Sequence, residues 1–266
     1  MRVRALESTA SSLACERFLS EVWRTDPACP PIAADVIRAI ADAGSYVTGA
    51  VDEATTGDRL LGACIGLWGP PGRPVMHSHL AGVHAAARGR DVGFVLKLDQ
   101  RAHALEHGVG EITWTFDPLV ARNAHFNLRK LGGTADEYLT NHYGRLSDGL
   151  NGADDSDRLL LRWDLLGGQV RAACDDGDRR APLDPAPPAL LATDGDRPRP
   201  RPVRDRTVLV PVPRDIEDLR AREPTAAREW RLAVRDVLGG LLTDGARLVD
   251  FDRTACGYVV TREGSR

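Results

Sequence analysis

Residues 77 to 93, with the sequence HSHLAGVHAAARGRDVG, have the residue types of a loop that binds a chain of phosphates. Gly89 and Gly93 let a ligand come close to the backbone, and Arg88 and Arg90 add positive charge. A helical pattern begins at the end of this stretch, and the unpaired N–H groups and dipole of a helix start attract anions. The stretch therefore predicts an anion-binding loop.

Asp91 complicates this prediction, because a carboxylate repels a pyrophosphate. Aspartate is also a common helix cap, so a plain cap in a loop that binds nothing is one interpretation. In the other interpretation the Asp91 side chain turns outward or pairs with Arg88 or Arg90, and the loop still binds its anion. The P-loop and dinucleotide-binding patterns are both absent, so a nucleoside triphosphate and NAD are poor candidates.

Composition restricts the class of protein further. The chain has 266 residues, of which 42% are hydrophobic and 27% charged, and its net charge of -3 gives no overall attraction to nucleic acid or to an anionic membrane. No apolar run approaches the roughly 20 residues of a membrane span, and the N-terminus lacks the apolar core of a signal peptide. The five cysteines show no ligand spacing. We therefore expect a cytoplasmic protein without a metal.

The elements that must position the loop can be predicted from apolar periodicity. The order β, α, α, β, β, β, α, β, α and two further strands indicates an α/β (α+β) domain over residues 1–166. Residues 167–206, rich in Pro, Asp and Arg, are predicted to form a linker or long loop. Residues 207–266 are predicted to form a smaller α+β extension that packs on the first domain.

Periodicity also predicts which side chains share a face. On the strand before the loop, alternation places His77 and His79 on one face, with Met76, Ser78 and Leu80 on the other. The helix after the loop is predicted to bury Phe94, Leu98, Ala102 and Leu105. The helix that follows Pro224 is predicted to bury Trp230, Val234, Val237 and Leu241.

Residues 88 to 93, RGRDVG, resemble the Gln/Arg-x-x-Gly-x-Gly/Ala hallmark of the GNAT superfamily of acyl-CoA N-acyltransferases. The element order over residues 1–166 is similar to that family, and RNAHFNLRKLGG resembles the helix before its sixth strand. HSHLAGV, WTFDPL and RNAHFNLRKLG also resemble larger predicted GNAT acetyltransferases that carry a C-terminal extension. The resemblance implies a mixed, mostly antiparallel central sheet flanked by helices. Asp91 replaces the family's central glycine, at a position that often needs a positive φ, which aspartate tolerates.

The resemblance also implies where acetyl-CoA or another acyl-CoA binds as co-substrate. The pantetheine arm is expected to pair with the backbone near Val83 and Ala85, and Asn123 is expected to contact its amide. His125 or Asn127 is expected to face the acceptor. The expected pyrophosphate loop is Arg88, Gly89, Arg90, Asp91, Val92 and Gly93.

Acyl transfer to an amine needs a base that removes a proton and a donor that stabilises the thioester oxygen. Histidine titrates near neutrality, so His77 and His79 are the candidate bases. Asp117 is predicted to orient a histidine, to bind the acceptor ammonium or to cap the next helix. The tyrosine with which many members of the family protonate the departing thiolate falls at Leu128, so Tyr138 and Tyr143 are candidate replacement acids.

The predicted function is therefore transfer of an acetyl or other short acyl group from acyl-CoA to a primary amine of a small molecule. The alternative is a catalytically weak or inactive protein of the same fold that binds acyl-CoA or another ligand. A third interpretation makes the C-terminal segment a dimerisation or substrate-covering element, with a homodimer as the assembly. No nucleic-acid or membrane partner is expected.

Overall fold

The computed structural model of the chain describes residues 1–53, 59–146, 148–149, 154–176, 183 and 185–263. The chain divides into two compact units. The first comprises Met1–Trp114, Ser147–Leu150 and Asp164–Leu166, and the second comprises Thr115–Leu146, Asn151–Trp163 and Gly167–Arg266. These two units are defined by their internal contacts and not by independent folding. The predicted division into residues 1–166, 167–206 and 207–266 therefore stays a prediction.

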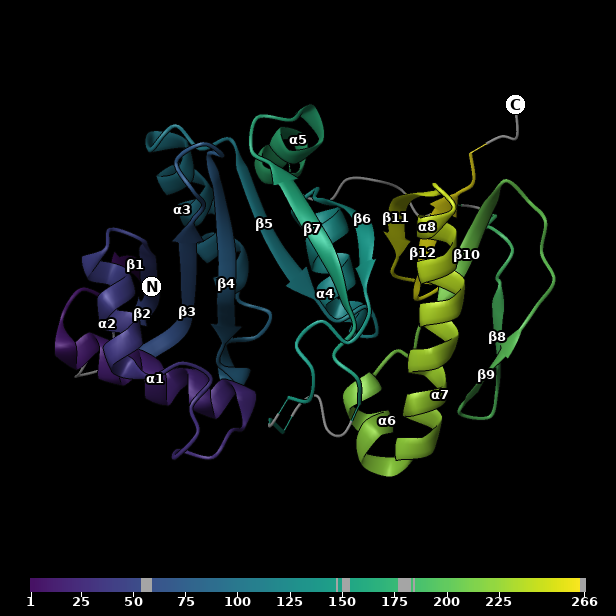
Figure 1. Cartoon of the computed structure of the whole chain (residues 1–266), viewed down its shortest axis with the longest axis horizontal. Helices are drawn as coiled ribbons and strands as arrows, with labels where there is room; N and C mark the ends of the chain where they lie inside the picture. The colour runs from purple at the N-terminus through teal and green to yellow at the C-terminus, as the bar shows by residue number, and fades with distance from the viewer. Residues whose placement is uncertain (54–58, 147, 150–153, 177–182, 184, 264–266) are drawn as a thin grey trace. The chain divides into compact units, whose positions relative to one another are not determined.

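The first unit contains a sheet with the strand order β1-β2-β3-β4-β5 (Figure 1). Neighbouring strands are antiparallel except β4 and β5, which are parallel. This mixed, mostly antiparallel sheet with flanking helices confirms the predicted fold class. The strands are β1 Arg2–Ala5, β2 Tyr46–Asp52, β3 Arg59–Trp68, β4 Val75–Val83 and β5 Glu111–Phe116, and the helices are α1 Thr9–Trp23, α2 Ala34–Asp42, the 3-10 turn η1 Ala85–Ala87 and α3 Val92–Glu106.

Helices cover both faces of this sheet. Ala63 and Ile65 of β3 pack in one apolar cluster with side chains of α1 and α2. Gly62, the neighbour of Ala63, points the other way, and a Cβ on it would lie 2.8 Å from Val92 and Leu96 of α3. Because successive strand residues face opposite sides, α3 lies on the face that α1 and α2 leave uncovered (Figure 1). The missing side chain at Gly62 lets α3 approach the sheet closely.

One extra residue interrupts β4. Ile65 pairs with Leu80 and Gly66 pairs with Ser78, so His79 forms a β-bulge opposite β3. Leu80 packs against the α1 and α2 cluster, whereas Ser78 binds a side chain of α3. The prediction that Ser78 and Leu80 share a face is therefore wrong, because a bulge reverses the alternation of side chains beyond it.

The buried face of α3 also differs from the prediction. The helix buries Val92, Leu96, Lys97, Gln100 and Ala104. The predicted stripe of Phe94, Leu98, Ala102 and Leu105 is half-buried or exposed. Lysine and glutamine seldom lie in a protein interior. Apolar periodicity alone therefore does not identify a helix face that contains both as the buried one.

The second unit contains the short helix α4 and the antiparallel strands β6 and β7. The residues of the C-terminal extension also belong to it. The extension forms the β10-β12-β11 sheet and a helical segment, and the β8-β9 hairpin precedes it in the chain. The elements are α4 Ala121–His125, the π-helical turn η2 Phe126–Lys130, β6 Thr134–Leu139, β7 Arg158–Asp164, α5 Gly168–Asp176, β8 Leu191–Asp194, β9 Arg197–Pro200, β10 Thr207–Pro211, α6 Ile216–Arg222, α7 Pro224–Val234, the π-helical turn η3 Arg235–Gly239, α8 Gly240–Thr243, β11 Arg247–Asp252 and β12 Gly257–Thr261.

Two details of this unit depart from the sequence prediction. The segment predicted as a linker contains α5 and the β8-β9 hairpin, whose turn includes Gly195 with φ of 59°; residues 177–182 and 184 lie outside the described residues. The inward stripe of the C-terminal helical segment is Trp230, Val234, Leu238 and Leu242. The π-helical turn η3 changes the helical period there, so Leu238 and Leu242 replace the predicted Val237 and Leu241.

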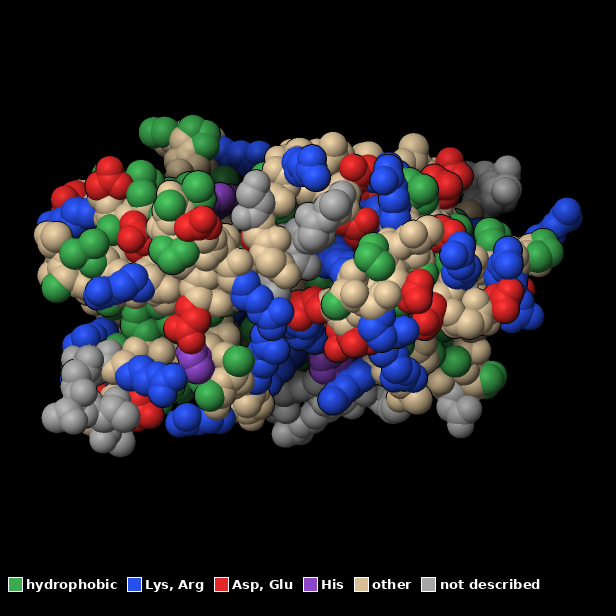
Figure 2. Space-filling model, turned by 90° about the horizontal axis from the view of Figure 1, so that it is seen from below, with side chains coloured by type: hydrophobic (Ala, Val, Ile, Leu, Met, Phe, Trp, Pro, Cys, Tyr) green, Lys and Arg blue, Asp and Glu red, His purple; other side chains and the backbone are tan. Residues whose placement is uncertain are grey.

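The surface carries both signs of charge. Figure 2 shows acidic and basic side chains near one another over much of one face, in keeping with the net charge of -3. Among the residues that the structure describes, no helix combines the length and apolar character that a membrane crossing requires. Within the same described ranges, no group of three or more His, Cys, Asp or Glu side chains could hold a metal ion.

Candidate active site

Strands β4 and β5 form a fork. Their parallel pairing joins Val75 to Glu111, Met76 to Ile112 and His77 to Thr113. Ser78 and Trp114 are the next residues on the two strands, so they begin the two arms of the fork. The bulge at His79 lies directly beyond this point and bends β4 further. The backbone groups of β4 beyond His77 thus lie at an opening in the sheet.

His77 and His79 lie together at this fork, with ring centroids 6.1 Å apart. The Nδ1 atom of His77 is 3.5 Å from Oγ1 of Thr113 on β5. Protein around part of its ring lowers the pKa of His79 below the ordinary histidine value, because burial disfavours the charged form. His79 is therefore neutral at neutral pH and can accept a proton there.

The loop between β4 and α3 has the backbone geometry of an anion site. Nδ1 of His84 accepts a hydrogen bond from the N–H of Ala86 at 3.1 Å and so starts the turn η1. Gly89 then has φ of 78° and Asp91 has φ of 57°, both in the left-handed region. Backbone N–H groups around such residues form concavities that bind anions, and α3 begins immediately afterwards. The side chains of Arg88 and Arg90 are exposed beside this loop.

The conformation of Asp91 explains why aspartate stands there. Its left-handed backbone confirms the expected positive φ, which aspartate adopts more readily than most residues other than glycine. Although Asp91 is the N-cap residue of α3, its side chain accepts no hydrogen bond from the helix. The interpretation of Asp91 as a side-chain cap of α3 is therefore wrong.

Lys97 is a feature of this region that sequence reasoning missed. Its side chain is only 4% exposed, on the face of α3 that meets the sheet. Its ammonium donates to Oγ of Ser78 at 2.7 Å and lies 3.8 Å from the centre of the Trp114 ring. The sequence contains a signal for its burial. Val92, Leu96, Gln100 and Ala104 repeat every four residues and so share one face of the helix, and Lys97 lies next to Leu96 at the edge of that face.

Asp117 lies in the second unit and is held by arginines. Arg231 donates to both of its carboxylate oxygens at 2.8 and 2.9 Å, and Arg220 donates to one of them at 2.8 Å. Burial would raise the pKa of Asp117, but the charges of Arg231 and Arg220 hold it well below its usual range. Asp117 also accepts from the N–H of Leu119 at 2.8 Å, a contact of the capping kind. Its roles toward a histidine or the acceptor stay predictions.

The remaining predicted residues also lie in the second unit. The hydroxyl of Tyr138 donates to Oδ2 of Asp157 at 2.8 Å, and Arg235 binds the same carboxylate. Burial and the charge of Asp157 raise the pKa of Tyr138, which makes the phenol a weaker acid. Asn123 is exposed, His125 is half-buried, and Asn127 and Leu128 are buried. These roles toward substrate stay predictions.

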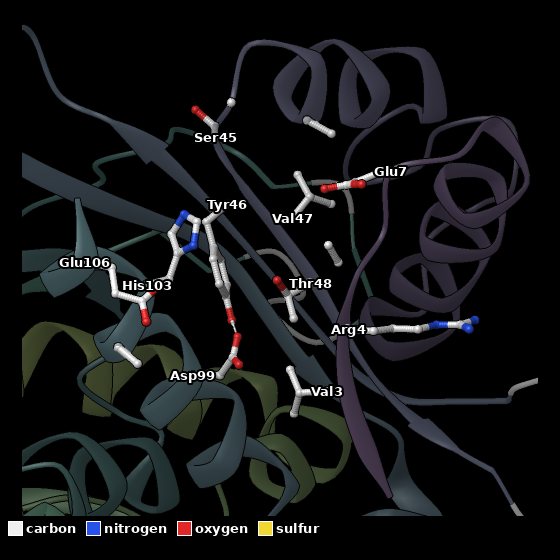
Figure 3. Close-up of a pocket in the computed structure, with 14 residues that line it drawn as sticks. Val3, Arg4, Glu7, Ser45, Tyr46, Val47, Thr48, Asp99, His103 and Glu106 are labelled. Atoms are coloured by element: carbon white, nitrogen blue, oxygen red, sulfur yellow. Dashed lines mark hydrogen bonds between the residues drawn. The ribbon is translucent and has the colours of Figure 1, made fainter.

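A separate cavity of about 360 Å³ lies beside β1, β2 and α3 (Figure 3). In it the hydroxyl of Tyr46 donates to Asp99 at 2.7 Å, and the ring of His103 lies 5.1 Å from that of Tyr46. Its lining includes none of the residues predicted for the active site. The cavity therefore differs from the fork and the anion loop.

Comparison with known proteins identifies the fold. No family model matches the chain, and no curated protein is similar to it in sequence. An N-acetyltransferase from Staphylococcus aureus Mu50 is similar in structure, with a TM-score of 0.50 and 15% identity over 62% of this chain and 98% of that one. Aminoglycoside 6'-acetyltransferase type Ii has a TM-score of 0.49 and 15% identity over 63% of this chain and 99% of its own. An aminoglycoside 6'-N-acetyltransferase complexed with coenzyme A has a TM-score of 0.47 and 13% identity, over 63% and 98% of the two chains.

Over about 62% of its length, the chain has the fold of GNAT N-acetyltransferases. This confirms the fold that the RGRDVG motif and the element order predicted. At 15% identity the likeness concerns the fold alone.

Proposed function

We propose that this protein is a GNAT-type N-acyltransferase that moves an acetyl or other short acyl group from acyl-CoA to a primary amine of a small molecule. The observation that carries the proposal is the loop before α3, where Gly89 and Asp91 are both left-handed. Such a loop at a helix N-terminus, beside two exposed arginines, suits the pyrophosphate of coenzyme A. Val83, Ala85 and Asn123 are assigned to pantetheine, and Val92 and Gly93 to the phosphates.

In this proposal the thioester lies at the fork of β4 and β5. A base near the fork removes a proton from the acceptor amine as its nitrogen attacks the thioester carbon. His79 is the preferred base, because its lowered pKa keeps it neutral, and His77 is the second candidate. Backbone N–H groups of β4 beyond the last pair with β5 are suited to stabilise the oxygen of the tetrahedral intermediate.

The same proposal covers the residues that contact the acceptor, the location of the protein and its assembly. His125 and Asn127 are assigned to the acceptor, and Asp117 and Tyr138 remain candidates for supporting roles. Asp117 is engaged by two arginines, so positioning suits it better than proton transfer. We further propose a cytoplasmic enzyme, active as a homodimer or as a monomer whose C-terminal segment covers the substrate.

One observation favours the alternative, a protein of this fold that binds acyl-CoA without turnover. Leu128 occupies the position of the tyrosine that the GNAT resemblance would supply as an acid, and it is 2% exposed. A buried leucine cannot donate a proton, so a thiolate would leave less easily.

Calorimetry with acetyl-, succinyl- and longer acyl-CoA tests both candidates at their common step, which is binding. The variants Arg88→Ala and Arg90→Ala should each weaken binding about tenfold, since one charge-assisted contact contributes roughly 1.5 kcal/mol or more. Arg17→Ala, an exposed arginine on α1, is the matched control. Absence of heat with every acyl-CoA would remove both candidates.

Detection of free thiol during incubation with acyl-CoA and a panel of amines separates the two candidates. Steady thiol release that depends on an amine identifies the enzyme. Binding without such release identifies the binding protein.

A further inference from the structure

The side chain of Lys97, on the buried face of α3, contacts one residue of each arm of the fork. Its ammonium donates a hydrogen bond to Ser78, the first residue of the β4 arm, at 2.7 Å. It also lies 3.8 Å from the centre of the ring of Trp114, the first residue of the β5 arm. The positive charge therefore marks the point where the two strands separate.

The surroundings of Lys97 leave its charge largely uncompensated. Its third contact is the amide oxygen of Gln100, one turn along α3, at 3.0 Å. In the part of the chain that the structure describes, no carboxylate forms an ion pair with this ammonium. A hydroxyl, an amide and an aromatic face orient a cation but do not neutralise it. A ligand group that develops negative charge at the fork would be stabilised there.

Few titratable groups surround Lys97. Sγ of Cys64 on β3 lies 3.7 Å from Oγ of Ser78, so it approaches the same hydroxyl. Asp99, two residues along α3, binds the hydroxyl of Tyr46 on β2. Burial lowers the pKa of Lys97 from its ordinary value to about 8. A group with that pKa carries a proton at neutral pH and can release it readily.

We propose that the Lys97 ammonium donates a proton to the thiolate of coenzyme A as it leaves, an inference that rests on the proposed acyl transfer. It would supply the acid that Leu128 cannot. The acceptor nitrogen bonds to the thioester carbon, the carbon–sulfur bond breaks, and its electron pair stays on sulfur. One N–H bond of Lys97 breaks as the S–H bond forms, which leaves a neutral lysine.

The remaining protons balance through solvent. The proton lost by the acceptor amine passes to the base, preferably His79, and from there to water. Lys97 regains a proton from water once the thiol has left. The acidities of Lys97 and of a thiol, whose ordinary pKa is about 8.5, are close enough for rapid proton transfer.

The chain offers a direct measurement, because its two lysines are Lys97 and Lys130. Protein labelled with ¹³C at the lysine Cε atoms gives two side-chain signals, and the variant Lys130→Arg assigns them. Each signal is followed through a pH titration of the free protein, of its complex with coenzyme A and of its complex with desulfo-coenzyme A. The two ligands carry the same phosphates, so they differ at the fork only in the sulfur.

A thiolate beside Lys97 should raise its titration midpoint by at least about one pH unit with coenzyme A, and desulfo-coenzyme A should leave it near the value of the free protein. Equal midpoints in the two complexes would overturn the inference while leaving the acyltransferase proposal intact. A rise with succinyl-CoA but not with coenzyme A would also overturn it, because Lys97 would then pair with an acyl carboxylate. If calorimetry detects no acyl-CoA binding, the proposed function fails first.

Kinetics with Lys97→Met provide the second measurement. Loss of the acid should lower kcat about 100-fold with acetyl-CoA, because general acid catalysis contributes factors of this order. The dissociation constant for acetyl-CoA should stay within about twofold, since the loop at residues 88 to 93 is unchanged. Lys130→Met is the matched control. Unchanged kcat in Lys97→Met would overturn the inference, and the titration of the wild-type protein decides the matter if this variant does not fold.

Discussion

Arg231 binds both carboxylate oxygens of Asp117, although 114 residues separate the two in the sequence. Arg231 is 1% exposed and Asp117 is 6% exposed, so the pair is buried within the second unit. Asp117 directly follows β5, and Arg231 belongs to α7 in the C-terminal extension. Within the second unit, α7 thus holds the residue that directly follows β5. Nearby, the hydroxyl of Tyr258 on β12 donates to the carbonyl oxygen of Pro118 at 2.7 Å.

Arg231→Met should lower the free energy of unfolding by about 3 to 5 kcal/mol, because it leaves a buried carboxylate with one cation fewer. Urea denaturation at neutral pH measures this loss. Arg228→Met, an exposed arginine on the same helix, should change stability by less than about 0.5 kcal/mol. Equal stabilities of the two variants would show that the buried pair contributes little.

Acid should weaken the same contact. The pKa of Asp117 is lowered in the folded protein from the ordinary 3.8. Its contribution to stability is therefore fully present above pH 3.8 and is lost as the pH falls through the lower folded value. Urea denaturation at several acidic pH values should show wild type losing more stability than Asp117→Asn, which has no carboxyl to protonate at this position.

Asp91→Gly and Asp91→Asn should both tighten acyl-CoA binding, because each removes a negative charge beside the proposed pyrophosphate site. Both residues also tolerate the left-handed backbone that Asp91 adopts, so the loop should keep its shape. Calorimetry should show about a threefold to tenfold gain that shrinks at high salt. A gain with glycine alone would indicate relief of backbone strain, and no gain with either would show that the carboxylate does not oppose the ligand.

His79→Ala should lower kcat about 100-fold or more, as expected for loss of a general base. Because burial lowers the pKa of His79, wild-type activity should persist below pH 6.5 and then decline as the ring becomes protonated. His107→Ala, at the C-terminal end of α3, is the histidine control. Turnover that survives His79→Ala at every pH would transfer the role to His77 or to water.

Lys97 should also influence stability at alkaline pH. Burial lowers its pKa from 10.5 to about 8, so in that pH range the folded protein binds fewer protons than the unfolded chain. Unfolding then takes up a proton, and stability should rise with pH through this window. Relative to Lys97→Met, wild type should gain about 3 kcal/mol between pH 7 and 10.5, measured by urea denaturation. A difference between the two proteins that does not vary with pH would contradict the lowered pKa.

Much of the fold could be predicted from local signals. Ser8 begins α1 as its capping residue, the RGRDVG motif begins α3, and alternation identifies β4 and the hairpin near the C-terminus. These features depend on residues a few positions apart. The GNAT-like element order follows from them, and the structural comparison confirms it over about 62% of the chain.

The rest depends on information that local patterns do not carry. Lys97 is polar at a buried position, so periodicity assigned α3 a different inward face. The partners of Asp117 lie more than 100 residues away on the extension, and no spacing rule connects them. For the candidate site, the loop was predictable, whereas the charged contacts around the fork required the three-dimensional structure.

The bulge at His79 has a consequence for the tolerance of β4 to mutation. Before the bulge, the even-numbered Met76 and Ser78 are buried, and Ser78 meets α3; after it, the even-numbered Leu80 and Gly82 meet the α1 side. A saturation scan of β4 should therefore show side-chain preferences that alternate along the strand. The even-numbered residues meet α3 before His79 and the α1 side after it. Deletion of His79 would remove the irregularity while keeping both layers packed. The even–odd pattern of side-chain directions in β4 is thus opposite on the two sides of His79, and any redesign of the sheet must preserve both patterns.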